Sequence, residues 1–284
     1  MKYQIAALFI LLLLVTGCSD KPSQSEEPKA SKTTPATEPP NGESFSLPIL
    51  NLDMLWCKSG TFMMGSPSSE KDHDDDETQH RVNLTKGFYL GKYEVTQVQW
   101  EKVMGSNPSY HKGAALPVEN VSWDDAMEFC EKLTEVEKEA DRLPKGWTYT
   151  LPTEAQWEYA CRAGTTTAYS FGDTITPKQA NFVYNVGKTT QVGTYPANAW
   201  SFHDMHGNVW EWCSDRYGAY PSGAVSDPLG PSVGSERVYR GGSWFLNGGL
   251  VRSATRRRGT PVNRDNSLGF RLSLQTEKKE RSDP

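Results

Sequence analysis

The stretch LPTEAQWEYACRAG, residues 151–164, predicts a short helix with a complete start signal. Thr153 and Gln156 stand three residues apart, which is the spacing of a capping box. Trp157 and Ala160 then recur on one face, and the glycine at 164 favours a stop near that residue. We therefore expect an aromatic, half-buried helix at this point of the chain.

Two further helices and several strands are predicted around it. Thr96–Gln99 forms a second capping box, with Gly105 closing the helix, and Ser122–Asp125 opens a longer helix. Short runs with alternating apolar residues favour strands at three places: Arg81–Leu84, Phe88–Tyr93 and Arg237–Arg240. Helices and strands thus follow one another without a regular repeat, which favours an α+β fold.

The composition indicates a loop-rich domain that does not bind nucleic acid. Nine Trp, twelve Tyr, ten Phe and 24 Gly accompany a net charge of −5. Large rings fill a core with few residues, and glycines allow tight turns. A net negative charge over the whole chain does not favour a nucleic-acid partner. Two long loops, 165–200 and 216–236, must be held by a function, a metal or a disulfide.

The N-terminus is a predicted lipoprotein signal. Lys2 precedes an apolar run, Ile5–Val15, that is too short to span roughly 30 Å of hydrocarbon. It ends in Val15–Cys18, which looks like a bacterial lipobox, so we expect cleavage before Cys18 and acylation of that cysteine. The alternative is an ordinary cleaved signal peptide with a chance cysteine.

This signal sets the predicted domain organisation and localisation. Residues 1–17 form the signal peptide, 18–47 a lipidated cysteine with a polar, disordered tether, 48–275 the domain and 276–284 a polar tail. The expected location is the bacterial cell envelope, with the lipid in a membrane. Ser19 after the cysteine favours the outer membrane in a Gram-negative cell.

Five other motifs give the chain a family resemblance. They are GTFMMGS at 60–66, GKYEVTQVQW at 91–100, DMHGNVWEW at 204–212, RGGSW at 240–244 and LGFRL at 268–272. In this order, with 151–164, they closely resemble the formylglycine-generating enzyme family, the sulfatase-modifying-factor domain, from about Met54 to Leu274. The resemblance implies an α+β fold related to the C-type lectin fold, loop-rich and with little regular secondary structure.

The resemblance also implies calcium. In the family's first site, carboxylates come from Asp204 and Glu211 and backbone carbonyls from Gly207 and Val209; hard oxygen ligands of this kind suit Ca²⁺. A second family site begins at Asn181 and the carbonyl of Phe182, although the segment 184–190 supplies no carboxylate. The alternative is that these residues pack and form hydrogen bonds without an ion. A transition-metal cluster at His203 and His206 is disfavoured against structural histidines.

The cysteines argue against the family's copper chemistry. Its oxidising members hold Cu(I) on two thiolates in the segment after RGGS, whereas residues 240–272 contain no cysteine. Leu246 and the region 247–249 stand at the expected positions, so we assign no catalytic residue and expect no copper. The four cysteines of the domain either form disulfides of unknown connectivity or remain buried thiols: Cys57, Cys130, Cys161 and Cys213. The resemblance places Cys130 and Cys161 where a secreted relative forms disulfides, with partners that correspond here to Leu272 and Ser253.

The same C-terminal segment is rich in arginine and offers a candidate ligand surface. We expect Arg240, Arg252 and Arg271 to pair internally, in part with the acidic run 72–77, and we expect that run itself to be a solvated loop. The candidate ligand-binding residues are Phe245, Asn247, Arg257 and Arg258, which suit a protein or an anionic small molecule.

Two functions follow from these observations. The favoured one is a lipid-anchored envelope protein whose domain is a non-catalytic ligand-binding, display or scaffold module. The segment from RGGSW to LGFRL also resembles the variable region of diversified ligand-binding proteins with this fold. The alternative is an envelope protein-modifying oxidase related to formylglycine-generating enzyme. A third reading is a structural lipoprotein in a larger envelope machine.

Overall fold

Three helices of the computed structural model begin where the capping boxes predict. Their N-caps are Thr96, Ser122 and Thr153, and in each the side chain and the third helical residue bond each other's backbone amides. The helices are α1 (Gln97–Met104), α2 (Trp123–Glu139) and α3 (Glu154–Arg162). α3 ends at Ala163 and Gly164, both with positive φ, which confirms the predicted stop.

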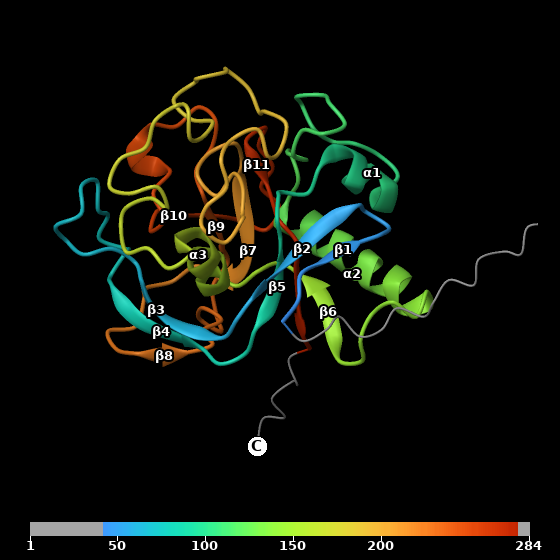
Figure 1. Cartoon of the computed structure of the whole chain (residues 1–284), viewed down its shortest axis with the longest axis horizontal. Helices are drawn as coiled ribbons and strands as arrows, with labels where there is room; N and C mark the ends of the chain where they lie inside the picture. The colour runs from blue at the N-terminus through green and yellow to red at the C-terminus, as the bar shows by residue number, and fades with distance from the viewer. Residues whose placement is uncertain (1–41, 278–284) are drawn as a thin grey trace, which may run out of the picture. The chain divides into compact units, whose positions relative to one another are not determined.

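The strands form three small sheets (Figure 1). The first, in the order β1-β2-β5-β12-β6, is antiparallel and contains β1 (Phe45–Leu47), β2 (Leu52–Cys57), β5 (Phe88–Gly91), β12 (Ser273–Thr276) and β6 (Trp147–Thr150). The second, β10-β9-β7-β11, contains β10 (Arg256–Gly259), β9 (Arg237–Arg240), β7 (Trp210–Arg216) and β11 (Leu268–Gly269). The third, β3-β4-β8, contains β3 (Gly60–Met64), β4 (His80–Leu84) and β8 (Val225–Ser226).

The helices divide the core into two main clusters. α1 and α2 lie beside the first sheet in Figure 1, and Trp100 of α1 stacks on Phe129 of α2 with ring centroids 5.5 Å apart. α3 lies between the other two sheets and buries Trp157 and Cys161 against them. Rings thus fill much of this interior, as the composition predicts.

Side chains hold the long loops in place. The loop between α3 and β7 contains no helix and no extended strand. The side chain of Asn198 bonds the backbone of this loop to the end of α3. Its side-chain amide donates to the carbonyls of Ala160 and Cys161 at 2.8 and 3.1 Å, while its carbonyl accepts from the amides of Trp200 and Phe202. Buried backbone groups are satisfied in this way without a sheet.

The structure describes residues 42–277, so Cys18, the signal peptide and residues 18–41 of the tether lie outside it. Within that range β1 covers residues 45–47, which the sequence analysis assigned to the tether, and it pairs with β2. Three residues surrounded by polar sequence give too short a pattern to be recognised. At the other end, Glu277 still donates its amide to Gly146. No helix in 42–277 is both apolar and long enough to cross a membrane.

Candidate functional site

Three buried carboxylates lie around one buried arginine where the motifs meet. Arg271, from LGFRL, donates to both oxygens of Glu211, from WEW, at 2.6 and 2.7 Å. Trp157 of α3 adds a bond from its indole nitrogen to Glu211 at 2.7 Å. Asp204 and Glu94, both buried, complete this carboxylate cluster. The contacts explain why distant motifs occur together in one sequence.

The cluster holds more negative charge than its arginine offsets. Burial raises the pKa of Asp204 to about 6, although the Gly193 amide and Arg271 act in the opposite direction. Burial, together with Asp204 and Glu211, raises the pKa of Glu94 well above its usual range. One Glu94 oxygen is buried without a hydrogen-bond partner. A buried excess of carboxylate is costly unless it is protonated or neutralised by a cation.

The predicted carbonyl ligands lie in the turn beside these carboxylates. Gly207 has φ +90°, and a Cβ there would lie 2.2 Å from the carbonyl oxygen of Asn181, so this position requires glycine. Val209 is fully buried just before β7. The donor set of carboxylates and carbonyls is the oxygen chemistry that Ca²⁺ takes, although within residues 42–277 no group of three or more His, Cys, Asp or Glu side chains is arranged to hold a metal ion.

The structure links the second predicted site to the first. Asn181 donates from its side chain to Asn208 at 3.2 Å, and Asn208 in turn donates to Glu94 at 3.0 Å. The Asn181 side-chain oxygen is buried without a hydrogen-bond partner, whereas the Phe182 carbonyl accepts from the Asn185 amide. Asn181 can therefore offer an oxygen to a cation, but no carboxylate of the segment 181–190 accompanies it.

The two histidines have structural partners, as the sequence analysis favoured. His206 is buried; its Nδ1 donates to the Val251 carbonyl at 2.8 Å and its Nε2 accepts from the Ser170 amide. Burial lowers its pKa to about 4, so the ring stays neutral. His203 instead bonds the Tyr195 carbonyl through Nδ1.

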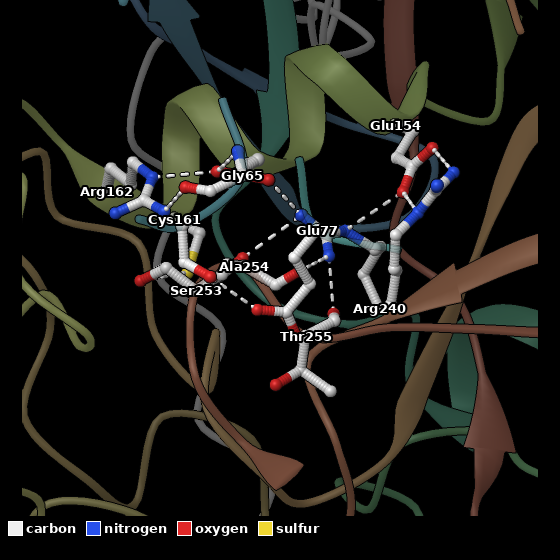
Figure 2. A network of polar contacts seen from close by, with 12 residues as sticks. Gly65, Glu77, Glu154, Cys161, Arg162, Arg240, Ser253, Ala254 and Thr255 are labelled. Carbon is white, nitrogen blue, oxygen red and sulfur yellow. Dashed lines mark hydrogen bonds and ion pairs between the residues drawn. The ribbon is translucent and has the colours of Figure 1, made fainter. Parts of the chain in front are cut away.

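The four cysteines of the described chain are free, buried thiols. Cys161 Sγ lies 3.7 Å from Ser253 Oγ, so the serine occupies the place that the resemblance gives to a disulfide partner (Figure 2). Cys130 and Leu272 likewise belong to one core cluster. The sequence left two alternatives open, disulfides or buried thiols. In the structure these four cysteines are buried thiols and form no disulfide.

Buried arginines of the C-terminal segment pair internally. Arg240 packs beside α3, whose first and last residues, Glu154 and Arg162, are labelled in Figure 2. Its guanidinium bonds Glu158, in the middle of that helix. It donates further to the Ala254 carbonyl at 2.6 Å. This network joins α3 to β9 and the segment before β10, and it leaves Arg240 unavailable to a ligand.

Arg252 confirms the predicted pairing with the acidic run and corrects the prediction that the whole run is a solvated loop. Its guanidinium bonds Glu77 at 2.7 and 2.8 Å and Glu70 at 2.7 Å. Glu77 is fully buried, so it is not part of a solvated loop, while Asp74 and Asp75 are exposed as expected. The reason is that a buried guanidinium requires a buried partner.

Phe245 belongs to a row of five rings that we call the aromatic strip: Tyr110, His111, Trp244, Tyr184 and Phe245. Neighbouring ring centroids lie 5.0–5.9 Å apart. The two tyrosines are 70% and 63% exposed, and Asn247 is exposed two residues after Phe245. Buried Nε atoms of His111 and Trp244 have no hydrogen-bond partner. Sequence reasoning missed the strip because its members come from three separate loops.

A strained loop holds one end of the strip. Val183 and Tyr184 have φ values of +54° and +55°, which are uncommon for residues other than glycine. Their amides donate to the carbonyls of Leu246 and Trp244 at 2.6 and 2.9 Å. These bonds place Tyr184 against the segment that follows RGGS. Strain of this kind is concentrated at binding sites.

The structure does not bring the four candidate ligand-binding residues together. Arg257 and Arg258 lie on β10, where they pair with Asp74 at 3.3 Å and Glu236 at 3.0 Å. Phe245 and Asn247 lie beside the loop at 183–184. Within residues 42–277 no hydrogen bond, ion pair or ring contact joins these two pairs.

Three short helices packed on curled sheets, with long pinned loops, define an α+β domain related to the C-type lectin fold. The chain belongs to the sulfatase-modifying factor enzyme 1-like domain family, whose model matches residues 46–276.

Individual relatives cover most of the chain. The chaperone protein LppX of Paenibacillus barcinonensis is 31% identical over 237 residues, 68% of this chain and 78% of that protein. The formylglycine-generating enzyme of Mus musculus is 26% identical over 298 residues, 80% of this chain and 76% of the enzyme. The solved structure of Treponema denticola variable protein 1 has a TM-score of 0.72 and 29% identity, covering 81% of this chain and 97% of that one.

Proposed function

We propose that this protein is a lipid-anchored envelope protein whose domain is a non-catalytic binding, display or scaffold module. The observation that carries the proposal is the segment after RGGS. It contains no cysteine, and Leu246, which stands where the resemblance places a copper thiolate, packs against a small apolar cluster around Tyr169 and Phe182. An apolar side chain cannot ligate Cu(I).

The remaining thiols of the domain support the same reading. Burial raises the pKa of Cys161 to about 12 and that of Cys57, Cys130 and Cys213 further. Cu(I) binds the thiolate, and burial disfavours that form even where arginines lie near, as they do at Cys161 and Cys213. None of these four side chains reaches the surface of the domain.

The aromatic strip, with Asn247 beside it, is the binding face that we propose. Exposed rings with low conformational entropy are frequent anchors of binding surfaces. The strained loop at Val183 and Tyr184 supports this choice, because it keeps Tyr184 on the strip at an energetic cost. Arg257 and Arg258 offer a separate, cationic candidate on β10 that suits an anionic ligand.

The alternative function is an envelope oxidase, which the similarity to the mouse enzyme favours. We expect the purified protein, incubated aerobically with copper, to leave a Cys-x-Pro-x-Arg peptide unchanged. Mass spectrometry measures the conversion of the thiol to the aldehyde. Conversion above that of a heat-inactivated sample would establish the oxidase and refute the non-catalytic reading.

Capture from envelope extract tests the binding face. We expect the Phe245→Ala, Asn247→Ala double variant to recover at least about tenfold less partner than wild type, the effect of losing one anchoring contact. Val262→Ala, an exposed apolar residue outside the strip, is the matched control. Equal recovery by all variants would show that the aromatic strip is not the binding face. If recovery falls only in an Arg257→Gln, Arg258→Gln variant, the binding face lies on β10 instead.

We also propose that a structural Ca²⁺ occupies the carboxylate cluster. Asp204, Glu211 and the carbonyls of Gly207 and Val209 are its ligands, and Glu94 adds charge that the sequence analysis did not include. Asn181 and Phe182 would serve a second site. The raised pKa of Asp204 and the unpartnered oxygen of Glu94 support the first site. A bound cation would stabilise the charged form of Asp204 and give the Glu94 oxygen a partner.

Lipidation at Cys18 anchors the protein in this proposal. Cys18→Ala is expected to abolish incorporation of a palmitate analogue and to move the protein from the membrane fraction to the soluble fraction, since several acyl chains are needed for stable anchoring. Cys161→Ser, a conservative change of a buried thiol, is the control and should keep the label. Undiminished labelling of the Cys18 variant would contradict a lipid on this residue.

A further inference from the structure

A hollow of about 450 Å³ lies between the β3–β4 hairpin and the end of α3. It shares no residue with the aromatic strip or the carboxylate cluster. Its size is within the usual range of small-molecule sites. The side chains that the following argument uses are Phe62, Arg81, Tyr159 and Trp200.

Three rings form an apolar wall of this hollow. Tyr159 lies between the other two, with centroid distances of 5.2 Å to Phe62 and 4.8 Å to Trp200. Gly60 makes room for the phenol, because a Cβ at that position would lie 2.2 Å from the Tyr159 hydroxyl. All three rings are only partly buried, so their edges remain open to a ligand.

Polar groups without partners accompany the rings. The exposed Arg81 guanidinium, the Tyr159 hydroxyl and the Trp200 indole nitrogen make no hydrogen bond or ion pair within residues 42–277. The Arg162 guanidinium, in contrast, already donates hydrogen bonds to Glu158 and to the carbonyls of Gly65 and Thr167. Burial raises the pKa of Tyr159, so its hydroxyl stays protonated and can donate. All three free groups are therefore donors.

We propose that this hollow binds a carboxylate attached to an aromatic or branched aliphatic group. The rings contact the apolar group, and Arg81 pairs with the carboxylate. Aromatic walls also attract cations, but the Arg81 charge repels them. The same chemistry occurs in a free N-acyl amino acid and at the C-terminal residue of a peptide, so both are sources to be distinguished.

Isothermal titration of the full-length chain in detergent tests the proposal with four probes. They are N-acetylphenylalanine, its amide, and a heptapeptide ending in phenylalanine with a free or an amidated C-terminus. We expect at least one free acid to bind and its amide to bind at least about tenfold more weakly, as the loss of a charge-assisted bond predicts. Preference for the peptide or for the small acid identifies the source.

Variants locate the site. Arg81→Gln is expected to reduce the affinity for the acid about tenfold, and Trp200→Ala to reduce it for acid and amide alike. Arg264→Gln, which changes an exposed arginine that pairs with Asp125 and does not line the hollow, should bind like wild type. Melting curves check that the Arg81 variant is folded. No binding at millimolar concentration, equal affinity for acid and amide, or an unchanged affinity in Arg81→Gln would each refute the proposal.

Discussion

Replacing Glu158 with alanine is expected to lower the free energy of unfolding by roughly 3–5 kcal/mol, the cost of breaking a buried ion pair. Glu158 is fully buried and accepts from Arg240, from Arg162 at 2.8 Å and from the Gly65 amide at 2.9 Å. Its removal leaves two buried guanidinium groups short of a partner. For a domain of this size the melting temperature should fall by about 6–20 °C.

The control is an ion pair of the same chemistry on the surface. Glu236 and Arg258 lie 3.0 Å apart with side chains 41% and 48% exposed. Glu236→Ala is expected to change stability by less than about 1 kcal/mol, because water screens an exposed pair. If the two alanine variants melt at the same temperature, burial of Glu158 does not have the importance that we assign to it.

Local sequence signals predicted the helices because each signal acts within four residues. Thr96, Ser122 and Thr153 bond amides three positions ahead, so the capping box can be recognised without knowing the rest of the fold. The first strand was not recognised because its stability depends on pairing with β2 and not on its own pattern.

The candidate site shows the same division. Asp204 and Glu211 stand in one motif and could be proposed from it, whereas Glu94 comes from the segment between β5 and α1 and joins them only through the fold. Its signal in the sequence was an acidic residue directly before Val95, and the structure shows that both positions are fully buried. A buried carboxylate requires a reason, so burial predicted at Glu94 would have pointed to the cluster.

The sequence did not show which arginines are buried in ion pairs and which are exposed, because the partner of each lies far away in the chain. Arg252 and Arg258 stand in the same basic run, but one has a buried carboxylate partner and the other an exposed one. The aromatic strip and the hollow beside α3 likewise combine residues that are distant in the chain. Such surfaces arise from loop placement, which short-range patterns do not determine.

Calcium is expected to raise the melting temperature of the protein by about 5–10 °C over that in chelator. A ligand present at 100 times its dissociation constant stabilises the folded state by about 2.7 kcal/mol, and each kcal/mol corresponds to roughly 2–4 °C for a domain of this size. The physical reason is the carboxylate cluster, where Arg271 faces three carboxylates, those of Glu94, Asp204 and Glu211. A dication removes the repulsion that burial intensifies.

Asp204→Asn separates a cation site from a purely structural cluster. In chelator this variant should melt no lower than wild type, because it removes a buried charge that lacks a cation, and calcium should no longer stabilise it. Asp173→Asn, a change of an exposed carboxylate that makes no hydrogen bond or ion pair within residues 42–277, should respond to calcium like wild type. A variant that is destabilised in chelator and still responds to calcium would place the ion elsewhere.

The pH dependence of the calcium effect gives a second readout. A folded-state pKa of about 6 for Asp204, above its unfolded value of about 3.9, means that the calcium-free protein gains stability through this group as the pH falls through 6. Calcium binding weakens over the same range because protons compete for the carboxylates. The melting temperatures in calcium and in chelator should therefore converge between pH 7.5 and pH 5. Curves that stay parallel, or that coincide already at pH 7.5, would rule out a calcium site at the carboxylate cluster.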